Sequence, residues 1–345
     1  MKAKLSRRTA VSTIATSLFV PWIAQQPSVV LAQSKPIPIR IGWLPDANGA
    51  FFVAKSQGLF EKVGLEPTYF KFISGPVTFA ALKSDSIDVT EFGVSAFVAG
   101  LANGIPMAAI GVAYDDGKVN ALVARPGTGI RSIPDLKGKK VAATSGSLSF
   151  LGLVVALHKY RMSFNDINYL NVPVTAMVPA FRNASIDAAW TWEPWAQRMV
   201  ADGGQIVATL DEFGVGDDVW AARKAWLKQQ PEAAIRFIHA LDLAAQMIRR
   251  DPNVTTAYVA EAFNIPPTMA RDIMSRVAMP TVSEQLDPES KHSVMHFATG
   301  KKGLAASIKT TAEIFVQQDI IKSFPPIESV FDSQPMMGYA KLKRP

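Results

Sequence analysis

The sequence lacks cysteine and has few histidines. No Cys occurs among its 345 residues, so disulfide bonds, thiolate metal sites and a lipid-bearing cysteine are excluded. Of the 4 histidines, only His292 and His296 have the four-residue spacing that places both on one helix face. A zinc site requires at least one more ligand, so we interpret this pair as part of a helix surface. We expect neither a metal nor a cofactor.

Motifs of the common catalytic sites are also missing. The chain has no Gly-x-Ser-x-Gly nucleophile elbow, no Walker phosphate-binding loop and no dinucleotide-binding glycine motif with a downstream acid. Hydrolytic, phosphoryl-transfer and redox functions therefore have no support in the sequence, and we expect a protein that is not an enzyme. A two-lobed enzyme stays open as an alternative, because a fold does not determine a function.

Acidic residues are absent from the N-terminal segment. Residues 1–32 begin with the basic stretch MKAKLSRR, continue with the apolar stretch TAVSTIATSLFVPWIA and end in Val30-Leu31-Ala32, which fits a cleavage site. We predict a cleaved export signal, with Ser6-Arg7-Arg8 similar to a twin-arginine motif and Sec export as the alternative. A membrane anchor is disfavoured because Pro21 and two glutamines interrupt the apolar run.

No later segment is long and apolar enough to cross a bilayer, so we expect a soluble, periplasmic protein after signal cleavage. The formal charge is +7, and four basic residues lie in the export signal, which leaves +3 for the remainder. This small excess gives little reason to expect a nucleic-acid partner.

Short apolar strands alternate with helical segments along most of the chain. This alternation predicts an α/β fold with mostly parallel sheets that are covered by helices on both faces. From Ala225 onward the pattern is helical, with breaks at proline residues. Strands are expected at 37–44, 65–72, 87–92, 107–113, 120–124, 141–143, 167–172 and 205–210, and from Ile186.

One sequence unit occurs twice. Ser86-Ile87-Asp88 and Ser185-Ile186-Asp187 each follow a predicted helix and begin a strand that leads into another helix. Two copies predict two similar lobes that face each other across a cleft. We place lobe 2 at 124–219, inserted into a lobe 1 formed by 35–123 and 220–332 with the helical C-terminal part. The crossings are expected near Leu122–Arg125 and Gly216–Ala221, and 333–345 is expected to be a flexible tail.

Several predicted helix starts follow predicted strands and are suited to an anion. Such helix ends combine free N–H donors with the positive end of the helix dipole. A serine at a helix start is also a common cap, so both interpretations stay open at each position. The candidate residues are Ser74, Gly75, Ser95, Ser147 and Ser149.

Acidic and aromatic side chains form a second group of candidates. Asp217 and Asp218 are adjacent, so on an extended chain only one of them faces a cleft. Glu193 lies near Trp192 and Trp195, where it either holds an ammonium group with help from the indoles or caps its helix. Two further candidates are Trp43, at the end of the first strand, and Asp46, in the turn that follows.

In their order and spacing, these residues resemble the taurine and aliphatic-sulfonate substrate-binding proteins of ABC importers. The resemblance extends from the first strand to Arg223 and is looser beyond it. It is carried by Gly42-Trp43, Lys71-Phe72-Ile73-Ser74-Gly75, Gly93-Val94-Ser95, Asp135-Leu136-Lys137-Gly138-Lys139, Ser147 and Ser149, Trp192-Glu193-Pro194, and Asp218-Val219-Trp220.

The resemblance implies a two-lobed periplasmic binding protein of type II, a monomer that closes on a small anionic or zwitterionic solute and delivers it to an inner-membrane permease. It implies that the candidate serines and Gly75 donate hydrogen bonds to a sulfonate, and that Asp218, with Glu193 nearby, receives a ligand amine. The family often has Gly-Tyr-Gln after the first strand, whereas this chain has Gly42-Trp43-Leu44. An aromatic or heterocyclic solute, or another small anion, therefore stays open.

Overall fold

The computed structural model describes residues 35–342, so the predicted export signal at 1–32 lies outside the described residues. Contacts divide the chain into Met1–Lys35 and Pro36–Pro345, and all described helices and strands belong to the second unit. No helix within 35–342 combines the length and the apolar character that crossing a bilayer requires.

Five strands form the first sheet. In order across the sheet they are β2 (Leu65–Lys71), β1 (Ile37–Trp43), β3 (Val89–Gly93), β10 (Asp217–Arg223) and β4 (Met107–Asp115). β1 is parallel to β2 and β3, whereas β10 is antiparallel to both β3 and β4. Four of the five strands therefore point the same way. Every residue of β3 and β10 is buried, as expected for central strands with both faces covered.

The second sheet repeats this arrangement with another part of the chain. Its order is β7 (Asn168–Asn171), β6 (Lys140–Ala143), β8 (Ala188–Trp192), β5 (Asn120–Ala124) and β9 (Gln205–Thr209). β6 is parallel to β7 and β8, and β5 is antiparallel to β8 and β9. The two sheets have equivalent topologies, which confirms the prediction of an α/β fold with two similar sheets.

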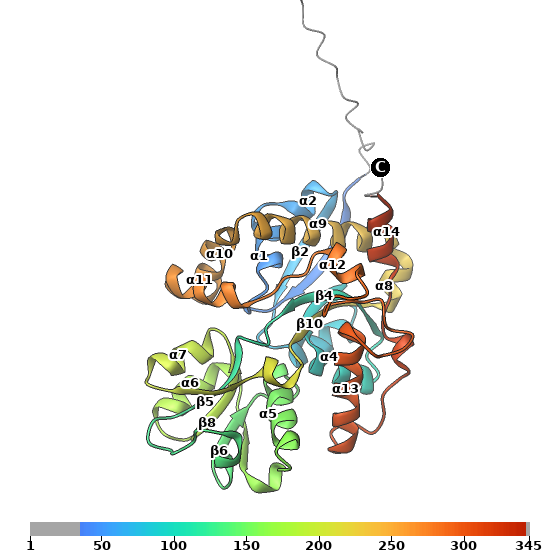
Figure 1. Cartoon of the computed structure of the whole chain (residues 1–345). Coiled ribbons are helices and arrows are strands. Elements are labelled where there is room, and N and C mark those ends of the chain that lie inside the picture. The colour runs from blue at the N-terminus through green and yellow to red at the C-terminus, as the bar shows by residue number, and fades with distance from the viewer. Residues whose placement is uncertain (1–34, 343–345) are drawn as a thin grey trace, which may run out of the picture. The chain divides into compact units, whose positions relative to one another are not determined.

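Helices connect these strands and cover the sheets (Figure 1). In the first lobe, the elements that surround the first sheet include α1 (Gly49–Ser56), α2 (Leu59–Lys62), the short 3₁₀ turn η1 (Gly75–Thr78), α3 (Phe79–Lys83) and α4 (Val94–Ala102). α1 and α2 are separated at Gly58, where a φ of 61° is left-handed and favours glycine. The second lobe contains α5 (Leu148–Lys159), α6 (Val174–Arg182) and α7 (Trp195–Ala201).

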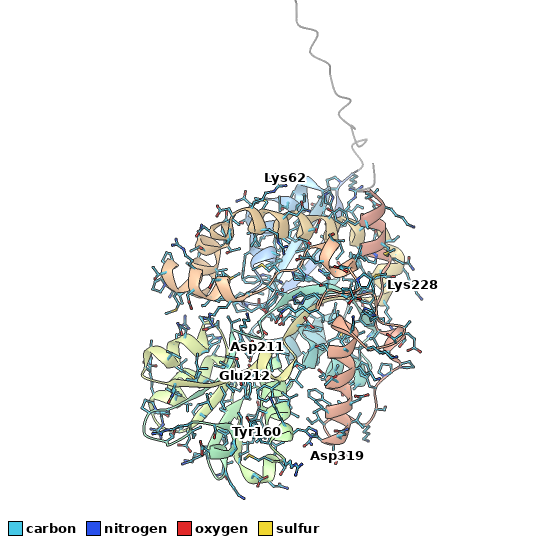
Figure 2. All side chains as sticks on the ribbon, viewed as in Figure 1. Lys62, Tyr160, Asp211, Glu212, Lys228 and Asp319 are labelled. Carbon is cyan, nitrogen blue, oxygen red and sulfur yellow. The ribbon has the colours of Figure 1, made fainter. Side chains whose placement is uncertain are left out.

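The remaining helices follow β10. They are α8 (Lys224–Gln229), α9 (Pro231–Arg250), α10 (Thr256–Phe263), α11 (Pro267–Arg276), α12 (Val282–Leu286), α13 (Gly303–Gln317) and α14 (Gln334–Leu342). α9 packs against α1 and α2 of the first lobe, and α13 contacts α4 as well as α5 of the second lobe. Figure 2 shows side chains between the elements and charged ones such as Lys62, Lys228 and Asp319 at the periphery.

The repeated Ser-Ile-Asp unit has a structural role at the starts of β3 and β8. The Asp88 carboxylate accepts the backbone N–H of Arg40 in β1 at 2.9 Å and pairs with Arg223 of β10 at 2.8 Å. Asp187 likewise accepts the N–H of Lys140 in β6 at 2.9 Å and pairs with Arg125 after β5 at 3.3 Å. The two aspartates therefore join equivalent strands in the two sheets.

The chain passes from one sheet to the other earlier in the sequence than the predicted crossings near Leu122–Arg125 and Gly216–Ala221. β5, at Asn120–Ala124, pairs with β8 and β9 of the second sheet, although most of it was assigned to lobe 1. The return begins after β9 and passes through the 3₁₀ turn η4 (Leu210–Phe213) to β10. The reason is that β5 and β10 are the antiparallel strands, and their apolar patterns do not show which sheet they join.

The expected flexible tail at 333–345 is wrong for its described part. Residues 334–342 form α14, which packs against α9 and buries Met336 and Tyr339 on one face. The Tyr339 hydroxyl donates to the buried Asp242 carboxylate at 2.8 Å. Two buried side chains three residues apart and one buried hydrogen bond hold this segment against α9.

Candidate functional site

A cavity lies where the carboxyl ends of strands from both sheets meet. It has about 430 Å³ of unfilled space, counting the part that is open to solvent. This is the edge at which α/β sheets usually hold ligands. Its lining comes from segments after β1 and β2, from the end of β4 and the segment after it, from the ends of β3 and β8, from β10, and from the first turns or starts of α4, β5 and α5. The lining residues are Leu44, Pro45, Asp46, Ile73, Ser74, Gly75, Pro76, Gly93, Ala96, Tyr114, Asp116, Asn120, Ser147, Leu148, Trp192 and Asp218.

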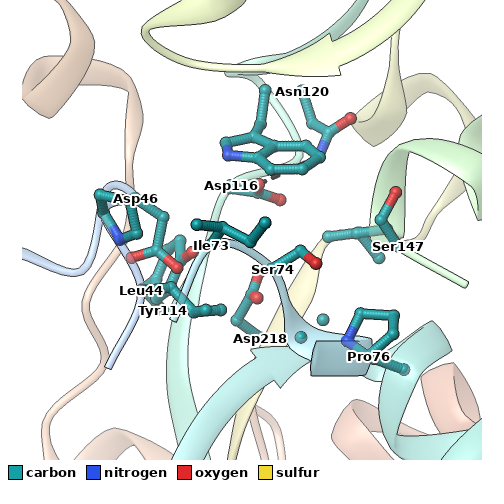
Figure 3. A pocket seen from close by; sticks show the side chains of 16 residues that line it. Leu44, Asp46, Ile73, Ser74, Pro76, Tyr114, Asp116, Asn120, Ser147 and Asp218 are labelled. Carbon is teal, nitrogen blue, oxygen red and sulfur yellow. Dashed lines mark hydrogen bonds between the residues drawn. The ribbon is translucent and has the colours of Figure 1, made fainter. Parts of the chain in front are cut away.

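Most of the predicted site residues come together here. The cavity is lined by six of them, from both lobes, although they are distant in the sequence: Asp46, Ser74, Gly75, Ser147, Trp192 and Asp218. Figure 3 shows Ser74 beside Asp218, with Ser147 across the cavity from Asp46. Four other predicted residues are not part of the lining: Trp43, Ser95, Ser149 and Glu193.

Trp43 is part of an aromatic cluster of the first lobe. Its ring stacks on Phe51 with centroids 5.9 Å apart and meets the edge of Phe52 at 5.8 Å. The ammonium group of Lys55 lies 4.7 Å from the centre of the Trp43 ring. Since the chain alternates, Leu44 rather than Trp43 lines the cavity.

Glu193 is engaged with other protein groups. One carboxylate oxygen accepts the backbone N–H of Gln197 in the first turn of α7 at 2.9 Å, and the other accepts from Arg276 of α11 at 3.1 Å. Burial raises the pKa of this carboxyl group, and the two donors oppose that rise. The helix-cap interpretation therefore describes its contacts, and Glu193 also ties the second lobe to α11.

Ser95 and Ser149 connect groups at the margin of the cavity. The Ser95 hydroxyl of α4 donates to the carbonyl of Gly146 in the second lobe at 3.4 Å. The Ser149 hydroxyl donates to Asn120 Oδ1 at 3.0 Å, and Asn120 in turn donates to Asp116 Oδ2 at 3.2 Å. Ser149 therefore orients a cavity residue.

The polar wall contributed by the first lobe is acidic. Asp46, Asp116 and Asp218 line the cavity, and Glu91 of β3 is buried behind them. Figure 3 shows the three cavity carboxylates together with the hydroxyl of Tyr114. Tyr114 is hydrogen-bonded to Asp46, and Glu91 Oε1 accepts the backbone N–H of Leu44 at 3.1 Å.

Burial dominates the protonation of these acids. Removal from water raises the pKa of Asp46 to about 7, against the hydrogen bonds from Tyr114 and Asn48. Burial, followed by repulsion from neighbouring carboxylates, raises the pKa values of Glu91 and Asp218 well above the ordinary range. For Asp116, burial again comes first, and it exceeds the opposing hydrogen bond from Asn120. The cluster therefore retains protons at pH values where ordinary carboxyl groups are ionised.

The opposite wall begins at the N-terminus of α5. The Ser147 hydroxyl accepts the backbone N–H of Phe150 at 3.3 Å and donates to the carbonyl of Thr144 at 2.7 Å. This serine is thus a true cap, whereas the first-turn N–H groups of Leu148 and Ser149 have no carbonyl partner within the helix. Because α5 has 12 residues, its dipole adds positive potential at this wall.

Within 35–342, one group of side chains has the composition of a metal site. Asp115, Asp217 and His292 have ligand atoms within 4.8 Å of one another. The Lys291 ammonium already lies 2.7 Å from Asp115 Oδ2. His292 and His296 belong to turns rather than to the helix face expected for them, because residues 287–302 form no helix.

Comparison with known proteins places the chain in a family. The sequence matches the family described as NMT1/THI5 like over residues 47–255, which is more than half of the chain. The chain belongs to this family. The match includes β2 to β10 and therefore two of the three cavity aspartates, Asp116 and Asp218. The third, Asp46, lies one position before the start of the match.

Relatives of this NMT1/THI5-like chain bear names that concern sulfonates. A putative aliphatic sulfonates-binding protein of Bacillus subtilis is 31% identical over 214 residues, which are 60% of this chain and 64% of that protein. The taurine-binding periplasmic protein of Escherichia coli is 25% identical over 227 residues, 64% of this chain and 70% of that protein. These two relatives are thus named as binding proteins, one of them periplasmic.

A solved structure has the same fold as this NMT1/THI5-like protein. It is the alkanesulfonate-binding protein SsuA from Xanthomonas axonopodis pv. citri bound to MOPS, with a TM-score of 0.74 and 21% identity. The match covers 87% of this chain and 99% of that chain. This chain therefore has the two-lobed fold of that structure.

Four polar groups at the site of this NMT1/THI5-like chain were not predicted: Glu91, Tyr114, Asp116 and Asn120. A sequence signal exists for two of them. Glu91 is a charged residue near the end of the predicted strand 87–92, and Asp116 follows the end of another predicted strand. Nothing in the sequence indicates that either would lie beside Asp218, because the strand pairing that joins them spans more than 100 residues.

Proposed function

We propose that this protein is the periplasmic solute-binding component of an ABC importer and that its ligand is a small sulfonate that also carries an amine. The protein would hold the solute between its two lobes and release it, chemically unchanged, to a permease in the inner membrane. Export would depend on the predicted signal at 1–32, and the protein would act as a monomer.

The observation that carries this proposal is the opposite polarity of the two cavity walls. Asp46, Asp116 and Asp218 of the first lobe attract a cation, whereas the start of α5 in the second lobe offers N–H donors and the positive end of a helix dipole to an anion. Taurine and MOPS, which appear in the names of two similar proteins, each combine an amine with a sulfonate. A zwitterion of this kind matches both walls.

The size of such a ligand explains why two lobes are needed. Very small ligands gain at most ~1.5 kcal/mol per non-hydrogen atom, so the roughly seven atoms of taurine have a ceiling near ~10 kcal/mol. Micromolar binding requires about 8 kcal/mol, and nearly every atom must therefore be in contact with protein. A ligand that touches both walls only when the lobes approach stabilises the closed arrangement. The stabilisation equals the difference between its binding free energies for the closed and the open protein.

Isothermal titration calorimetry of purified protein with taurine, ethanesulfonate and an aromatic sulfonate tests the proposal. We expect micromolar binding of taurine and weaker binding of ethanesulfonate. The absence of heat with every sulfonate would contradict the ligand class. Mass spectrometry of the released ligand separates binding from catalysis, since an importer component returns its ligand unchanged. The aromatic sulfonate belongs in the panel because half-buried Trp192 lines the cavity.

Gly93 provides a test of the role of the two lobes. It ends β3, and a Cβ atom at this position would lie 2.7 Å from Cβ of Leu148 in α5. We expect Gly93→Ala to weaken taurine binding by about tenfold or more, because overpacking costs about 1–3 kcal/mol and here acts on the approach of the lobes. The ligand-free variant should unfold at nearly the wild-type denaturant concentration.

The double variant Gly93→Ala/Leu148→Gly removes the clashing methylene group and should recover part of the lost affinity. Unchanged taurine binding by Gly93→Ala would mean that the lobes do not approach each other in this way around the ligand.

A further inference from the structure

The acidic wall contains more carboxylates than a single positive charge would require. Asp46, Asp116 and Asp218 line the cavity and are only 5%, 5% and 4% exposed, and Glu91 behind them is 0% exposed. Removing several carboxylates from water together is costly unless each finds a donor. These carboxyl groups lie at the cavity where strand ends of the two lobes meet.

The protein itself does not supply the missing donors. Oδ1 of Asp116 and Oδ2 of Asp218 are buried without a hydrogen-bond partner, and so is Oε2 of Glu91. Among residues 35–342, no lysine, arginine or histidine nitrogen lies within 4.0 Å of a carboxylate oxygen of these residues or of Asp46. Asp116 and Asp218 therefore each have one buried carboxylate oxygen that no described residue satisfies.

We propose that the cavity recognises an unsubstituted organic cation, a primary ammonium, amidinium or guanidinium group, that donates N–H bonds to Asp116 and Asp218 beside Asp46. This proposal rests on the proposed function for the place of the ligand and names the part of the ligand that binding requires. The number of N–H groups, rather than the positive charge alone, would decide affinity.

The acceptor count explains this choice. A primary ammonium has three N–H donors and a guanidinium has five, enough to satisfy both unpartnered oxygens at once. A trimethylammonium group carries the same charge and would be attracted by the indole of Trp192, but it has no N–H and leaves both oxygens unpaired. Charge recognition and hydrogen-bond recognition therefore make opposite predictions for methylated amines.

Entry of the cation also changes the protonation of the cluster. The titratable and charged groups around the cluster are Glu91 of β3, Tyr114 and Asp115 of β4, Asp217 of β10, and, on the outer side, Lys291 and His292 beside Asp115. Protons held by the buried carboxyl groups pass to solvent as the cation takes their place. No bond of the ligand breaks, and the charge of the site is balanced before and after binding.

Taurine and its N-methyl, N,N-dimethyl and N,N,N-trimethyl derivatives test the proposal by calorimetry, because they share one sulfonate and one positive charge. We expect affinity to fall with each lost N–H, by at least about tenfold between taurine and the trimethyl compound. The titrations are repeated at pH 6.5 in two buffers of different ionisation enthalpy, and the difference in heat should show net proton release with taurine.

Variants identify the acceptors. Asp116→Asn should reduce the preference for taurine over its trimethyl derivative at least about threefold, whereas Asp319→Asn removes an equal charge from the exposed end of α13 and should leave the preference unchanged. Removing a charge from a buried acidic cluster should not impair folding, and the melting temperature of each variant verifies this.

A parallel series of sulfonate-free amines separates this proposal from the proposed function. Binding of ethanolamine or propylguanidine, with the same loss on methylation, supports the cation site even if no sulfonate binds, and in that case only the sulfonate assignment fails. Equal affinity for taurine and trimethyltaurine, or binding of ethanesulfonate as tight as that of taurine, overturns the cation site while a sulfonate-binding function stands. No binding in either series overturns both.

Discussion

Replacing Asp218 by Asn is expected to weaken taurine binding by about 10- to 100-fold and to leave the affinity for ethanesulfonate unchanged or higher. Asp218 lies in β10, lines the cavity and is 4% exposed, and its Oδ2 has no partner among the described residues. A hydrogen bond to a charged group contributes about 1.5–3 kcal/mol, which corresponds to this range of affinities. Ethanesulfonate has no amine and would lose nothing.

The direction of the second change follows from electrostatics. The ionised form of Asp218 repels an anionic ligand, so its replacement by a neutral amide of the same shape removes that repulsion and cannot add to it. Calorimetry with both ligands on the same protein preparation measures the two changes together. Equal losses for taurine and ethanesulfonate would show that Asp218 does not receive the amine.

Asp217 is the matched control for this experiment. It precedes Asp218 in the same strand, but its carboxylate faces away from the cavity and lies 3.3 Å from His292 Nδ1. Asp217→Asn removes the same charge from nearly the same place. We expect it to change taurine affinity less than about threefold, since it touches no ligand and acts only through a charge at longer range.

The ligand-free protein is expected to lose stability as the pH rises from 5 to 8, by roughly 2–4 kcal/mol. The pKa of Asp46 is raised to about 7 in the folded protein by burial, against an ordinary value of about 3.9 in an unfolded chain. Between these two values the folded state holds a proton that the unfolded state has released. The contribution of Asp46 to the free energy of unfolding therefore falls through this window and levels off above pH 7.

Asp116, Asp218 and Glu91 act in the same direction, since their pKa values are also raised by burial. Acids with lowered pKa values, such as Asp88, contribute stability that is lost only at lower pH, as the pH falls through their folded pKa. The window from pH 5 to 8 therefore isolates the buried cluster of carboxyl groups at the cavity.

Urea denaturation at pH 5, 6, 7 and 8 measures this effect. Asp46→Asn keeps acceptors for Asn48 and Tyr114 but no longer titrates, so it should be more stable than the wild type at pH 8 and show a smaller decline from pH 5. Both proteins contain the same histidines, which cancels their contribution from the comparison. A stability that rises equally in both proteins over this range would show that the cluster is ionised at little cost.

The alternation of apolar strands and helical segments in the sequence was sufficient to predict the fold. Apolar strands separated by helices predicted two similar α/β lobes, because each element is recognisable from residues close in sequence. The assignment of β5 and the packing of α14 were not recoverable in this way. A short apolar strand such as Asn120–Ala124 fits either sheet, and the buried face of 334–342 becomes evident only against α9.

The site residues also divide into those that a local sequence pattern predicts and those that only the tertiary structure reveals. Ser74, Gly75 and Ser147 were recognised because a helix start after a strand is a local pattern, and Asp218 because it carries a family motif. Trp43 was predicted to line the cavity, but the next residue, Leu44, does so. Side chains alternate along the strand, and the indole of Trp43 therefore points toward Phe51.

By itself, the sequence determined that the protein has two similar lobes without disulfides, that helix starts meet strand ends, and that common catalytic motifs are absent. Tertiary structure alone decided that Glu91, Asp116 and Asp218 share one buried wall. Glu91 lies in β3, Asp116 follows β4 and Asp218 lies in β10, and these strands are brought together by pairing across the first sheet. Burial and mutual repulsion are properties of that assembled wall, so no single segment of the chain reveals the preference for a cation.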